Sequence, residues 1–217
     1  MIKAENIEKS YNGEKVLRGV NLEISDGEFV AIMGESGSGK STLISILGGF
    51  LSADSGRVLW NGEDISLFSD AKFATLRSTE VGFVFQFFKL IPTLNVKDNL
   101  VLPATLGGKS NADTLTYLNE LVSELKLDTL LSKYPDQLSG GQCQRAAIVR
   151  ALLYKPSMII LDEPTGALDS AMEEVVMNLI SRINKEMNTT VIMVTHSHKV
   201  AGYADRIINL RDGDIVK

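Results

Sequence analysis

The chain has 217 residues, a formal net charge of −5 and a single cysteine, Cys143. This length predicts one domain or a domain with a subdomain. Because the net charge is negative, the chain has no overall positive potential to attract nucleic acid, and we expect no nucleic-acid partner. One cysteine excludes an intrachain disulfide and a cysteine-based metal site, which fits a reducing cytosol. No apolar run reaches the ~20 residues of a membrane helix, and the amino terminus lacks the apolar segment of a signal peptide, so any membrane span is expected from a partner.

The amino-terminal part of the chain begins with strand patterns. About the first 30 residues are predicted as β-strands, because Val20, Leu22 and Ile24 alternate with polar residues. Apolar runs and turn signals predict four further elements: a buried strand at 29–33, a helix at 42–47, a hairpin at 57–62 around Asn61-Gly62, and a strand at 81–85.

Helical periodicity replaces this alternation between residues 95 and 154. Asn111 is predicted to cap one helix, whose apolar face is formed by Leu115, Leu118, Val122 and Leu125. A second helix is predicted over 142–154, ended by Pro156. Residues 95–154 are therefore predicted to form a helical region inserted into an α/β core.

Strands return after this region. Apolar strands are predicted at 158–161 and 191–194, with a helix over 170–187 between them. Such alternation of strands and helices indicates a parallel sheet. Asp212-Gly213 predicts a hairpin within residues 206–216.

Residues Gly34–Ser41 fit the pattern G-x-x-x-x-G-K-[ST] of phosphate-binding loops. The loop lies between a predicted strand and a predicted helix, where backbone N–H groups at a helix N-terminus can meet phosphate. Lys40 is expected to reach the β- and γ-phosphates, and the Ser41 hydroxyl to bind Mg²⁺. The alternative is an ordinary glycine- and serine-rich turn, which the flanking elements disfavour.

Two other predicted strands also end in polar residues. Asp162 and Glu163 follow one of them, and His196 follows the other. Because ligands bind beyond the carboxyl ends of parallel strands, these groups are expected to converge on the phosphate loop if the strands are neighbours. Asp162 suits a Mg²⁺ site, Glu163 could orient or deprotonate an attacking water, and His196 could bond the γ-phosphate. The alternatives are a capped strand end before Pro164 and a structural histidine.

The segment Leu138–Gln142 opens the second predicted helix of the helical region. Ser139 and Gln142 have the S-x-x-Q spacing of a capping box. Gly140 and Gly141 are unfavourable in a helix, but they allow an anion to approach exposed N–H groups closely. A second phosphate-binding helix N-terminus is therefore predicted besides the capping role. One γ-phosphate could contact both sites only if two chains pack head to tail.

The chain resembles the ATP-binding cassette (ABC) ATPase family over nearly its whole length. The matching elements, in family order, are Gly34–Ser41, Gln86, Leu138–Gln142, Met158–Glu163, Ala167–Asp169 and His196. The resemblance implies an α/β fold: a P-loop NTPase with a RecA-like core, an antiparallel β subdomain and an inserted α-helical subdomain. Residues 1–94 and 155–217 would form the core and β subdomain, and about 95–154 the helical subdomain.

The resemblance also implies a Mg²⁺-dependent ATPase in which two copies of the chain hold ATP between them. The catalytic residues would be Lys40, Glu163 and His196, and the Mg²⁺ ligands Ser41, Gln86 and Asp162. Tyr11 would contact adenine, with a plain surface tyrosine as the alternative. The phosphates would be contacted by Gly34, Glu35, Ser36, Gly37, Ser38, Gly39, Lys40, Ser41 and Thr42, and further ATP contacts would come from Gln86 and His196. The site shared by two copies would also contain Ser139, Gly140, Gly141, Gln142 and Asp169. Gln86 would also link the site to a membrane partner, and Asp169 would lie in a loop that communicates between the chains.

Residues 163–170 and 85–94 look like the branch containing MacB, LolD, FtsE and bacitracin-type peptide exporters. This branch implies that the partner is an integral membrane permease of the MacB/FtsX type. ATP hydrolysis would then drive export or mechanotransmission by that permease. The chain would then be cytoplasmic and peripheral on the inner face of the plasma membrane. Phe87, Phe88, Leu90 and Ile91 would line a groove for a cytoplasmic helix of that partner, although core packing explains this cluster nearly as well.

Other functions within the family remain alternatives. One is an ATP-gated regulator or scaffold at the membrane with little transport. The soluble types that act in DNA repair or translation carry long coiled coils or two cassettes, which this length does not fit, and Thr165–Ala167 favours the exporter branch over an iron–sulfur assembly type. Cys143 stands where a polar residue is common in the family, and it is expected to make the helix start thiol-sensitive.

Overall fold

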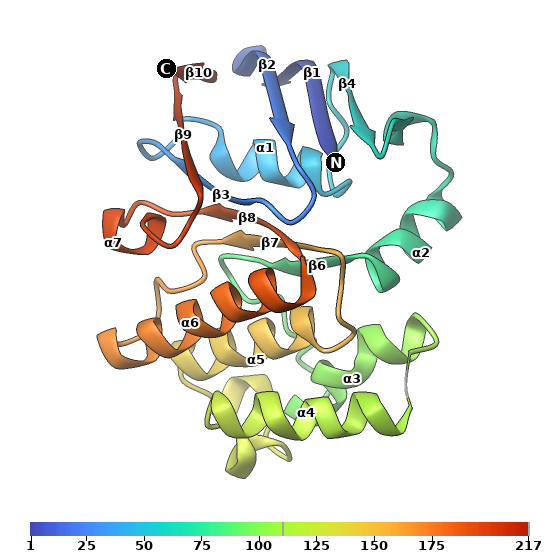
Figure 1. Cartoon of the computed structure of the whole chain (residues 1–217), viewed down its shortest axis with the longest axis vertical. Helices are drawn as coiled ribbons and strands as arrows, with labels where there is room; N and C mark the ends of the chain where they lie inside the picture. Colours follow the sequence, from blue (N-terminus) through green and yellow to red (C-terminus); the bar gives the residue numbers. More distant parts are fainter. Residues whose placement is uncertain (110, 217) are drawn as a thin grey trace.

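The computed structural model describes residues 1–109 and 111–216. Figure 1 shows helix α1 (Lys40–Leu47) between an antiparallel sheet and a mainly parallel sheet, with longer helices on the opposite face of the parallel sheet. These layers enclose two apolar cores, one between the sheets around α1 and one between the parallel sheet and the helices below it. Among the described residues, no helix combines the length and hydropathy that crossing a bilayer requires.

The antiparallel sheet has the strand order β2-β1-β4-β5. Its strands are β1 (Ile2–Tyr11), β2 (Glu14–Ile24), β4 (Ser55–Trp60) and β5 (Glu63–Asp64). The alternation predicted for Val20, Leu22 and Ile24 is confirmed, because all three side chains are buried. The predicted hairpin is also present: Asn61 and Gly62 both have positive φ, as a tight type I′ turn requires.

The second sheet has the order β10-β9-β3-β8-β7-β6. Its strands are β3 (Phe29–Met33), β6 (Val81–Val84), β7 (Met158–Asp162), β8 (Thr190–Val194), β9 (Arg206–Arg211) and β10 (Asp214–Val216). All pairs are parallel except β9 with β10, which form the predicted terminal hairpin. Every residue of β3, β7 and β8 is buried, because α1 and the antiparallel sheet cover one face of this sheet and longer helices cover the other.

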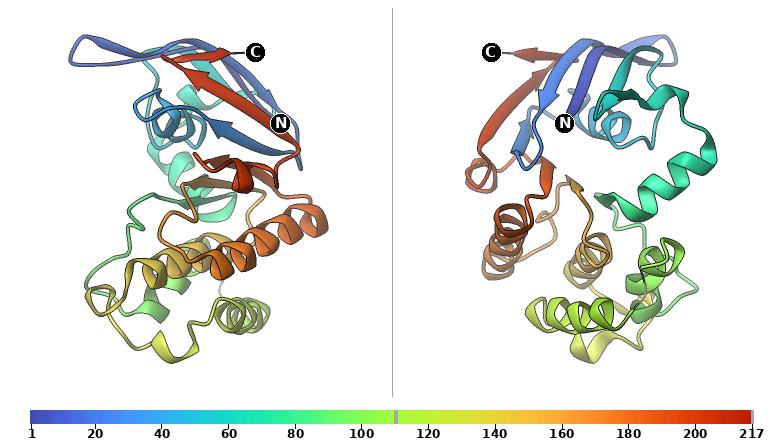
Figure 2. Two further views of the ribbon diagram at one scale, coloured as in Figure 1. Left: turned by 90° about the vertical axis from the view of Figure 1, so that its left-hand side faces the viewer. Right: turned by 45° about the vertical axis from the view of Figure 1, so that its right-hand side comes forward.

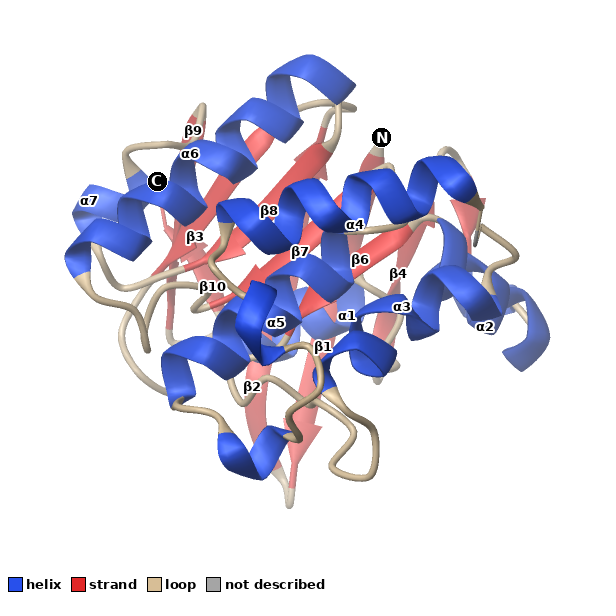
Figure 3. Ribbon diagram, turned by 90° about the horizontal axis from the view of Figure 1, so that it is seen from below, coloured by secondary structure: helices blue, strands red, loops and turns tan. Residues whose placement is uncertain are grey.

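Six helices accompany α1 in the described residues: α2 (Asp70–Thr79), α3 (Val96–Leu106), α4 (Ala112–Glu124), α5 (Gly140–Leu152), α6 (Ser170–Met187) and α7 (His198–Ala201). Short 3-10 turns lie at Ile65–Leu67, Asp128–Leu130 and Pro135–Gln137. Seen from below, α4, α5 and α6 lie over the strands of the parallel sheet (Figure 3). Figure 2 shows α3 to α5 at the end of the molecule opposite the antiparallel sheet. Their buried side chains belong to the same apolar cluster as one face of the parallel sheet.

The starts of the helices follow local sequence signals, with one exception. Helices α2 to α6 each begin at a side chain that accepts a hydrogen bond from a first-turn backbone N–H: Ser69, Asn95, Asn111, Ser139 and Asp169. The cap predicted at Asn111 is therefore confirmed. Helix α1 is the exception, since it begins at Gly39, which has a φ of 100° and no side chain to cap the helix. The N–H groups of its first turn are left for another acceptor.

Helices α2 and α4 differ from the sequence prediction. Helix α2 was not predicted, because none of its residues is buried and its apolar pattern is weak. Leu115 was predicted on the buried face of α4, but its side chain is 50% exposed. The apolar face is centred on Leu118, Leu121 and Val122, and at 3.6 residues per turn Leu115 lies roughly 70° from the centre of that face.

This difference between two leucines of one helix can be measured. Leu118→Ala should lower the free energy of unfolding by about 2–5 kcal/mol, because it leaves a cavity in the core. Leu115→Ala should change it by less than about 0.5 kcal/mol, because the side chain already contacts water. Urea unfolding followed by circular dichroism measures both values, and equal losses would contradict the placement of α4.

Candidate active site

The carboxyl ends of three parallel strands meet at one cavity of about 820 Å³, here called the strand-end cavity. Strand β8 lies between β3 and β7, and Val194 pairs with Ile32 on one side and Asp162 on the other. The predicted convergence of the strand ends is therefore present. The cavity is lined by Tyr11, Val16, Gly34, Ser36, Gly37, Gly39, Lys40, Ser41, Thr42, Gln86, Phe87, Phe88, Gln144, Asp162, Glu163, Gly166, Ala167, Val194 and His196.

The loop from β3 to α1 depends on glycine at two positions. A Cβ atom on Gly34 would lie 2.1 Å from the carbonyl oxygen of Leu210 in β9, so only glycine fits there. Gly39 has a left-handed backbone and places the uncapped N-terminus of α1 at the cavity. Free N–H groups and the helix dipole make this end of α1 suited to an anion such as phosphate.

Lys40 and Ser41 add a cation and a hydroxyl to this helix end. The Lys40 ammonium donates to the carbonyl oxygens of Gly34 (2.8 Å) and Glu35 (2.6 Å), which folds the side chain back over the loop. The Ser41 hydroxyl donates to Oδ1 of Asp162 at 3.2 Å. Burial raises the pKa of the Asp162 carboxyl, and the neighbouring Glu163 raises it further. A positive charge close to Asp162 would offset the cost of keeping this carboxylate ionised.

The oxygen atoms of Ser41 and Asp162 fit Mg²⁺ in the presence of a phosphate ligand. Within residues 1–109 and 111–216, no group of three histidine, cysteine or acidic side chains could hold a metal alone. Mg²⁺ is usually bound through one or two protein oxygens together with substrate phosphates, so a hydroxyl, a carboxylate and the adjacent phosphate loop satisfy its chemistry. Gln86, an exposed residue that also lines the cavity, offers a further amide oxygen.

Glu163 and His196 form a pair at the mouth of the cavity. Oε1 of Glu163 and Nδ1 of His196 lie 3.0 Å apart. The backbone of Glu163 is left-handed, with a φ of 49°, and its N–H donates to the carbonyl oxygen of Val194 at 3.1 Å. Strained backbone of this kind is concentrated at functional sites. This contact restricts the directions that the Glu163 carboxylate can take within the cavity that both residues line.

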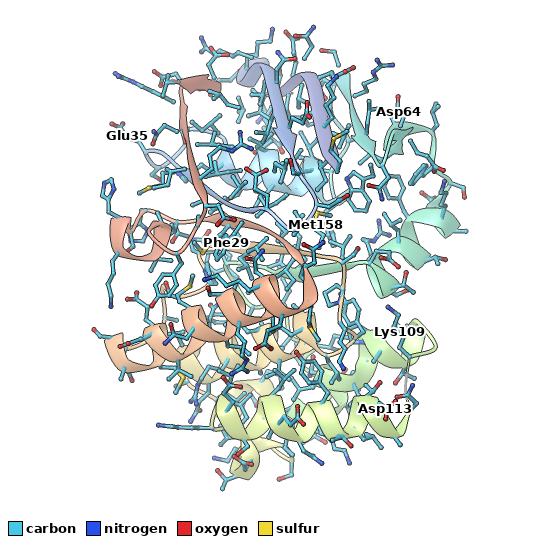
Figure 4. All side chains as sticks on the ribbon, in the orientation of Figure 1. Phe29, Glu35, Asp64, Lys109, Asp113 and Met158 are labelled. Carbon is cyan, nitrogen blue, oxygen red and sulfur yellow. The ribbon has the colours of Figure 1, made fainter. Side chains whose placement is uncertain are left out.

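Some of the predicted residues lie outside the cavity wall. Glu35 lies at the edge of the molecule, on the loop between β3 and α1 (Figure 4), and contributes its carbonyl group. Ser38 is buried, and its hydroxyl has no hydrogen-bond partner among the described residues. The Ser139–Gln142 segment and Asp169 do not line the cavity of this chain either. Asp169 instead caps α6 by accepting from the N–H of Met172 at 2.8 Å.

The Ser139–Gln142 segment forms the predicted capping box. Ser139 N–H donates to Oε1 of Gln142 at 2.8 Å, and Gln142 N–H donates to Oγ of Ser139 at 3.3 Å. Helix α5 begins at Gly140, two residues before the predicted start, because the capping box holds both glycines in the first turn. Gly141 has a packing role that was not predicted: a Cβ atom there would lie 2.8 Å from the carbonyl oxygen of Ala167.

The two glycines should therefore differ in their effect on stability. Gly141→Ala should destabilise the chain by on the order of 1–3 kcal/mol, because the methyl group meets a backbone carbonyl. In Gly140→Ala the added Cβ atom would have no neighbour closer than 3.8 Å. This substitution should therefore stabilise the helix by up to about 1 kcal/mol. Urea midpoints of the two variants measure this, and a shift in the same direction for both would contradict the packing of α5 on Ala167.

Sequence reasoning missed several cavity residues, of which Gln144 is the most unusual. Its side chain is only 1% exposed, and Nε2 has no hydrogen-bond partner in the described part of the chain. A buried amide without a partner costs about 1–3 kcal/mol. One signal was available: Gln144 is the polar member of an i, i+3, i+4, i+7 face that it shares with Ala147, Ile148 and Ala151.

Two other expectations concern single side chains. Tyr11 lines the cavity and is 45% exposed, so its ring is available for stacking.

Cys143 is buried, and this burial raises the pKa of its thiol. A raised pKa lowers the fraction of reactive thiolate, which argues against the expected thiol sensitivity of the helix start in the folded chain.

Comparison with known proteins decides the family. A family model described as ABC transporter matches residues 17–166. The chain belongs to this family. The lipoprotein-releasing system ATP-binding protein LolD of Porphyromonas gingivalis is 43% identical over 98% of this ABC cassette and 97% of its own length. The macrolide export ATP-binding/permease protein MacB of Campylobacter fetus is 44% identical over all of this chain, which spans only 34% of that longer protein.

Solved structures agree with the family and the fold. The ATP-binding cassette MJ0796, in a dimeric post-hydrolysis state bound to ADP and Pi, superposes on this ABC cassette with a TM-score of 0.94. The two are 39% identical, and the match covers 100% of this chain and 97% of MJ0796. The expected fold class is confirmed: the chain is an ABC ATP-binding cassette with the P-loop NTPase architecture.

Proposed function

We propose that this cassette hydrolyses ATP as one subunit of a dimer and drives a membrane permease. The observation that carries the proposal is the separation of two anion-binding features. The phosphate loop, Asp162 and Glu163 share the strand-end cavity, whereas the Ser139–Gln142 segment does not line it. A second copy, packed head to tail, would bring its own Ser139–Gln142 segment to the open side of each cavity. The dimeric state of MJ0796 supports this arrangement.

Different residues of the cavity would bind the nucleotide, hold Mg²⁺ and activate water. The N-terminus of α1 and the Lys40 ammonium would hold the phosphates, and the exposed Tyr11 ring would stack on the adenine. Ser41, Gln86 and Asp162 would hold Mg²⁺, which neutralises charge on the phosphate oxygens when bound. The Glu163 carboxylate would orient the attacking water and accept its proton, and His196 would keep that carboxylate aimed. The products are ADP and phosphate.

The second copy would complete the site with groups that carry no formal charge. The Ser139 hydroxyl and the N–H groups of Gly140 and Gly141 lie at the start of α5, whose dipole favours a negative charge. Burial lowers the pKa of Arg145 in α5, and the charge of Asp169, which lies near this helix start, partly offsets that lowering. Asp169 would thus face the second copy beside the shared nucleotide.

Replacement of the proposed catalytic carboxylate separates binding from turnover. Glu163→Gln keeps the shape of the side chain but removes the base, so kcat should fall at least about 100-fold while ATP affinity is retained. The variant should form a dimer on sizing chromatography in the presence of Mg-ATP. Glu174→Gln, at an exposed position of α6, is the control and should hydrolyse ATP like the wild type. Undiminished turnover in Glu163→Gln would refute its role, and a monomer with ATP would count against the shared site.

The partner is proposed to be a permease of the MacB/FtsX type, which would place the cassette on the inner face of the plasma membrane. The names of the similar proteins LolD and MacB support this class of partner. Of the four residues predicted to line a docking groove, Phe87 and Ile91 are 75% and 37% exposed. Phe88 and Leu90 instead pack against the apolar core, so the core-packing alternative holds for these two.

Ile91 allows a test of docking, because it lies outside the wall of the strand-end cavity. Ile91→Ser should leave the ATPase activity of the isolated cassette unchanged and reduce its stimulation by the reconstituted permease about fivefold, since an exposed apolar contact at an interface can contribute more than about 1 kcal/mol. Leu115→Ser, at an exposed leucine of α4, is the matched control. Equal stimulation of both variants and the wild type would exclude docking at Ile91.

A further inference from the structure

The loop that follows β6 has an unusual backbone. Phe88 and Lys89 are consecutive residues with φ values of 59° and 51°. The left-handed region costs roughly 1–2 kcal/mol for each residue with a side chain, so a strained pair needs support from its surroundings. Gln86, which lines the strand-end cavity, lies two residues before this pair.

Arg150 of α5 provides that support. Its Nη2 donates to the carbonyl oxygen of Phe88 at 2.7 Å, and its Nη1 donates to that of Lys89 at 2.6 Å. Both bonds are charge-assisted, and the rigid fork of the guanidinium fixes the two carbonyls relative to each other. The side chain is half-buried, so water competes only weakly for these bonds.

The remainder of the loop is held by the other neighbouring helix. Asn99 of α3 is fully buried and accepts from the N–H of Ile91 at 2.7 Å, and its amide donates to the carbonyl oxygens of Ile91 and Leu94 at 3.0 Å. The loop from Phe88 to Leu94 is therefore bonded to α3 and α5. Gln86 lies where the chain passes from the parallel sheet to this helix-bound loop.

We propose that Arg150 is a positioning residue, which sets Gln86 in the strand-end cavity by tying the backbone after it to α5. The same helix begins at the Ser139–Gln142 segment, about 15 Å away along its axis. A displacement of α5, when that segment meets the nucleotide of a second copy, is passed through Arg150 to Gln86 of its own chain. The inference rests on the proposed hydrolysis of ATP in this cavity.

The same helix supplies a matched control. Arg145 also donates through Nη1 to two consecutive carbonyl oxygens, those of Leu125 (2.5 Å) and Lys126 (3.2 Å), and Lys126 is left-handed with a φ of 53°. This second clamp holds the turn after α4, which does not line the strand-end cavity. A purely structural role of such arginines predicts similar effects of replacing either one, whereas positioning of Gln86 predicts a difference.

The first test compares kinetics. Arg150→Met should lower kcat about tenfold and raise the Mg²⁺ concentration for half-maximal activity at least threefold, while the KM for ATP changes less than twofold. Arg150→Lys, which can still bond one carbonyl, should give intermediate values. Arg145→Met also removes the bond from Nε to the carbonyl oxygen of Gly141 (3.3 Å), so the comparison uses the Mg²⁺ midpoint, which this variant should keep within twofold of the wild type. Equal shifts of the Mg²⁺ midpoint in the two methionine variants, or a wild-type kcat and Mg²⁺ midpoint in both Arg150 variants, would overturn the proposal.

The second test needs no turnover. In the protein without nucleotide, the amide hydrogens of residues 86–90 should exchange at least tenfold faster in Arg150→Met than in the wild type or in Arg145→Met. Unchanged exchange would overturn the proposal even if activity fell. If the wild type showed no ATPase activity while exchange behaved as expected, the proposed function would fail and the clamp on the loop would stand. Should Arg150→Met not fold, Arg150→Lys carries the same comparison, with exchange at least threefold faster as its expected result.

Discussion

The register of three parallel strands fixes the geometry of the strand-end cavity. Ile32, Val194 and Asp162 lie side by side across β3, β8 and β7, and each strand ends in a different functional segment. A shift of β8 by one residue would turn its alternate side chains to the opposite face of the sheet and move His196 away from Glu163. Complete burial of these strands makes such a shift costly, so the packing that stabilises the fold also sets the distances in the site.

The site is built from groups that are unfavourable for the folded chain alone. Asp162 is a desolvated carboxyl, Glu163 has a left-handed backbone, and α1 begins without a side-chain cap. The buried amide nitrogen of Gln144 has no hydrogen-bond partner within residues 1–109 and 111–216. Each of these features lowers stability in the isolated cassette. A bound nucleotide triphosphate with its cation could relieve the strain at Asp162 and α1. Folding and ligand binding are thus expected to be strongly coupled in this protein.

Sequence alone predicted the parts of this structure that depend on local chemistry. The phosphate loop, the caps at Asn111 and Ser139, and the buried strands follow from short patterns, because turn residues and periodicity act over a few positions. The face of α4 at Leu115, the packing of Gly141 on Ala167 and the clamp made by Arg150 were not predicted. These depend on which elements become neighbours, and residues 62 positions apart, such as Phe88 and Arg150, leave no local pattern.

Cys143 gives this chain a natural reporter of motion at the start of α5. Its thiol is the single one in the sequence, lies three residues after Gly140 and is covered by the turn at Pro135, whose carbonyl oxygen is 3.7 Å from Sγ. Because Cys143 is buried, opening of this first helical turn should speed its alkylation, and where labelling proceeds through the open form its rate is the intrinsic chemical rate multiplied by the opening equilibrium constant. Each tenfold change in that rate corresponds to about 1.4 kcal/mol of opening free energy. The unmodified chain can thus report, without any introduced label, how tightly a nucleotide or a second copy closes this helix end.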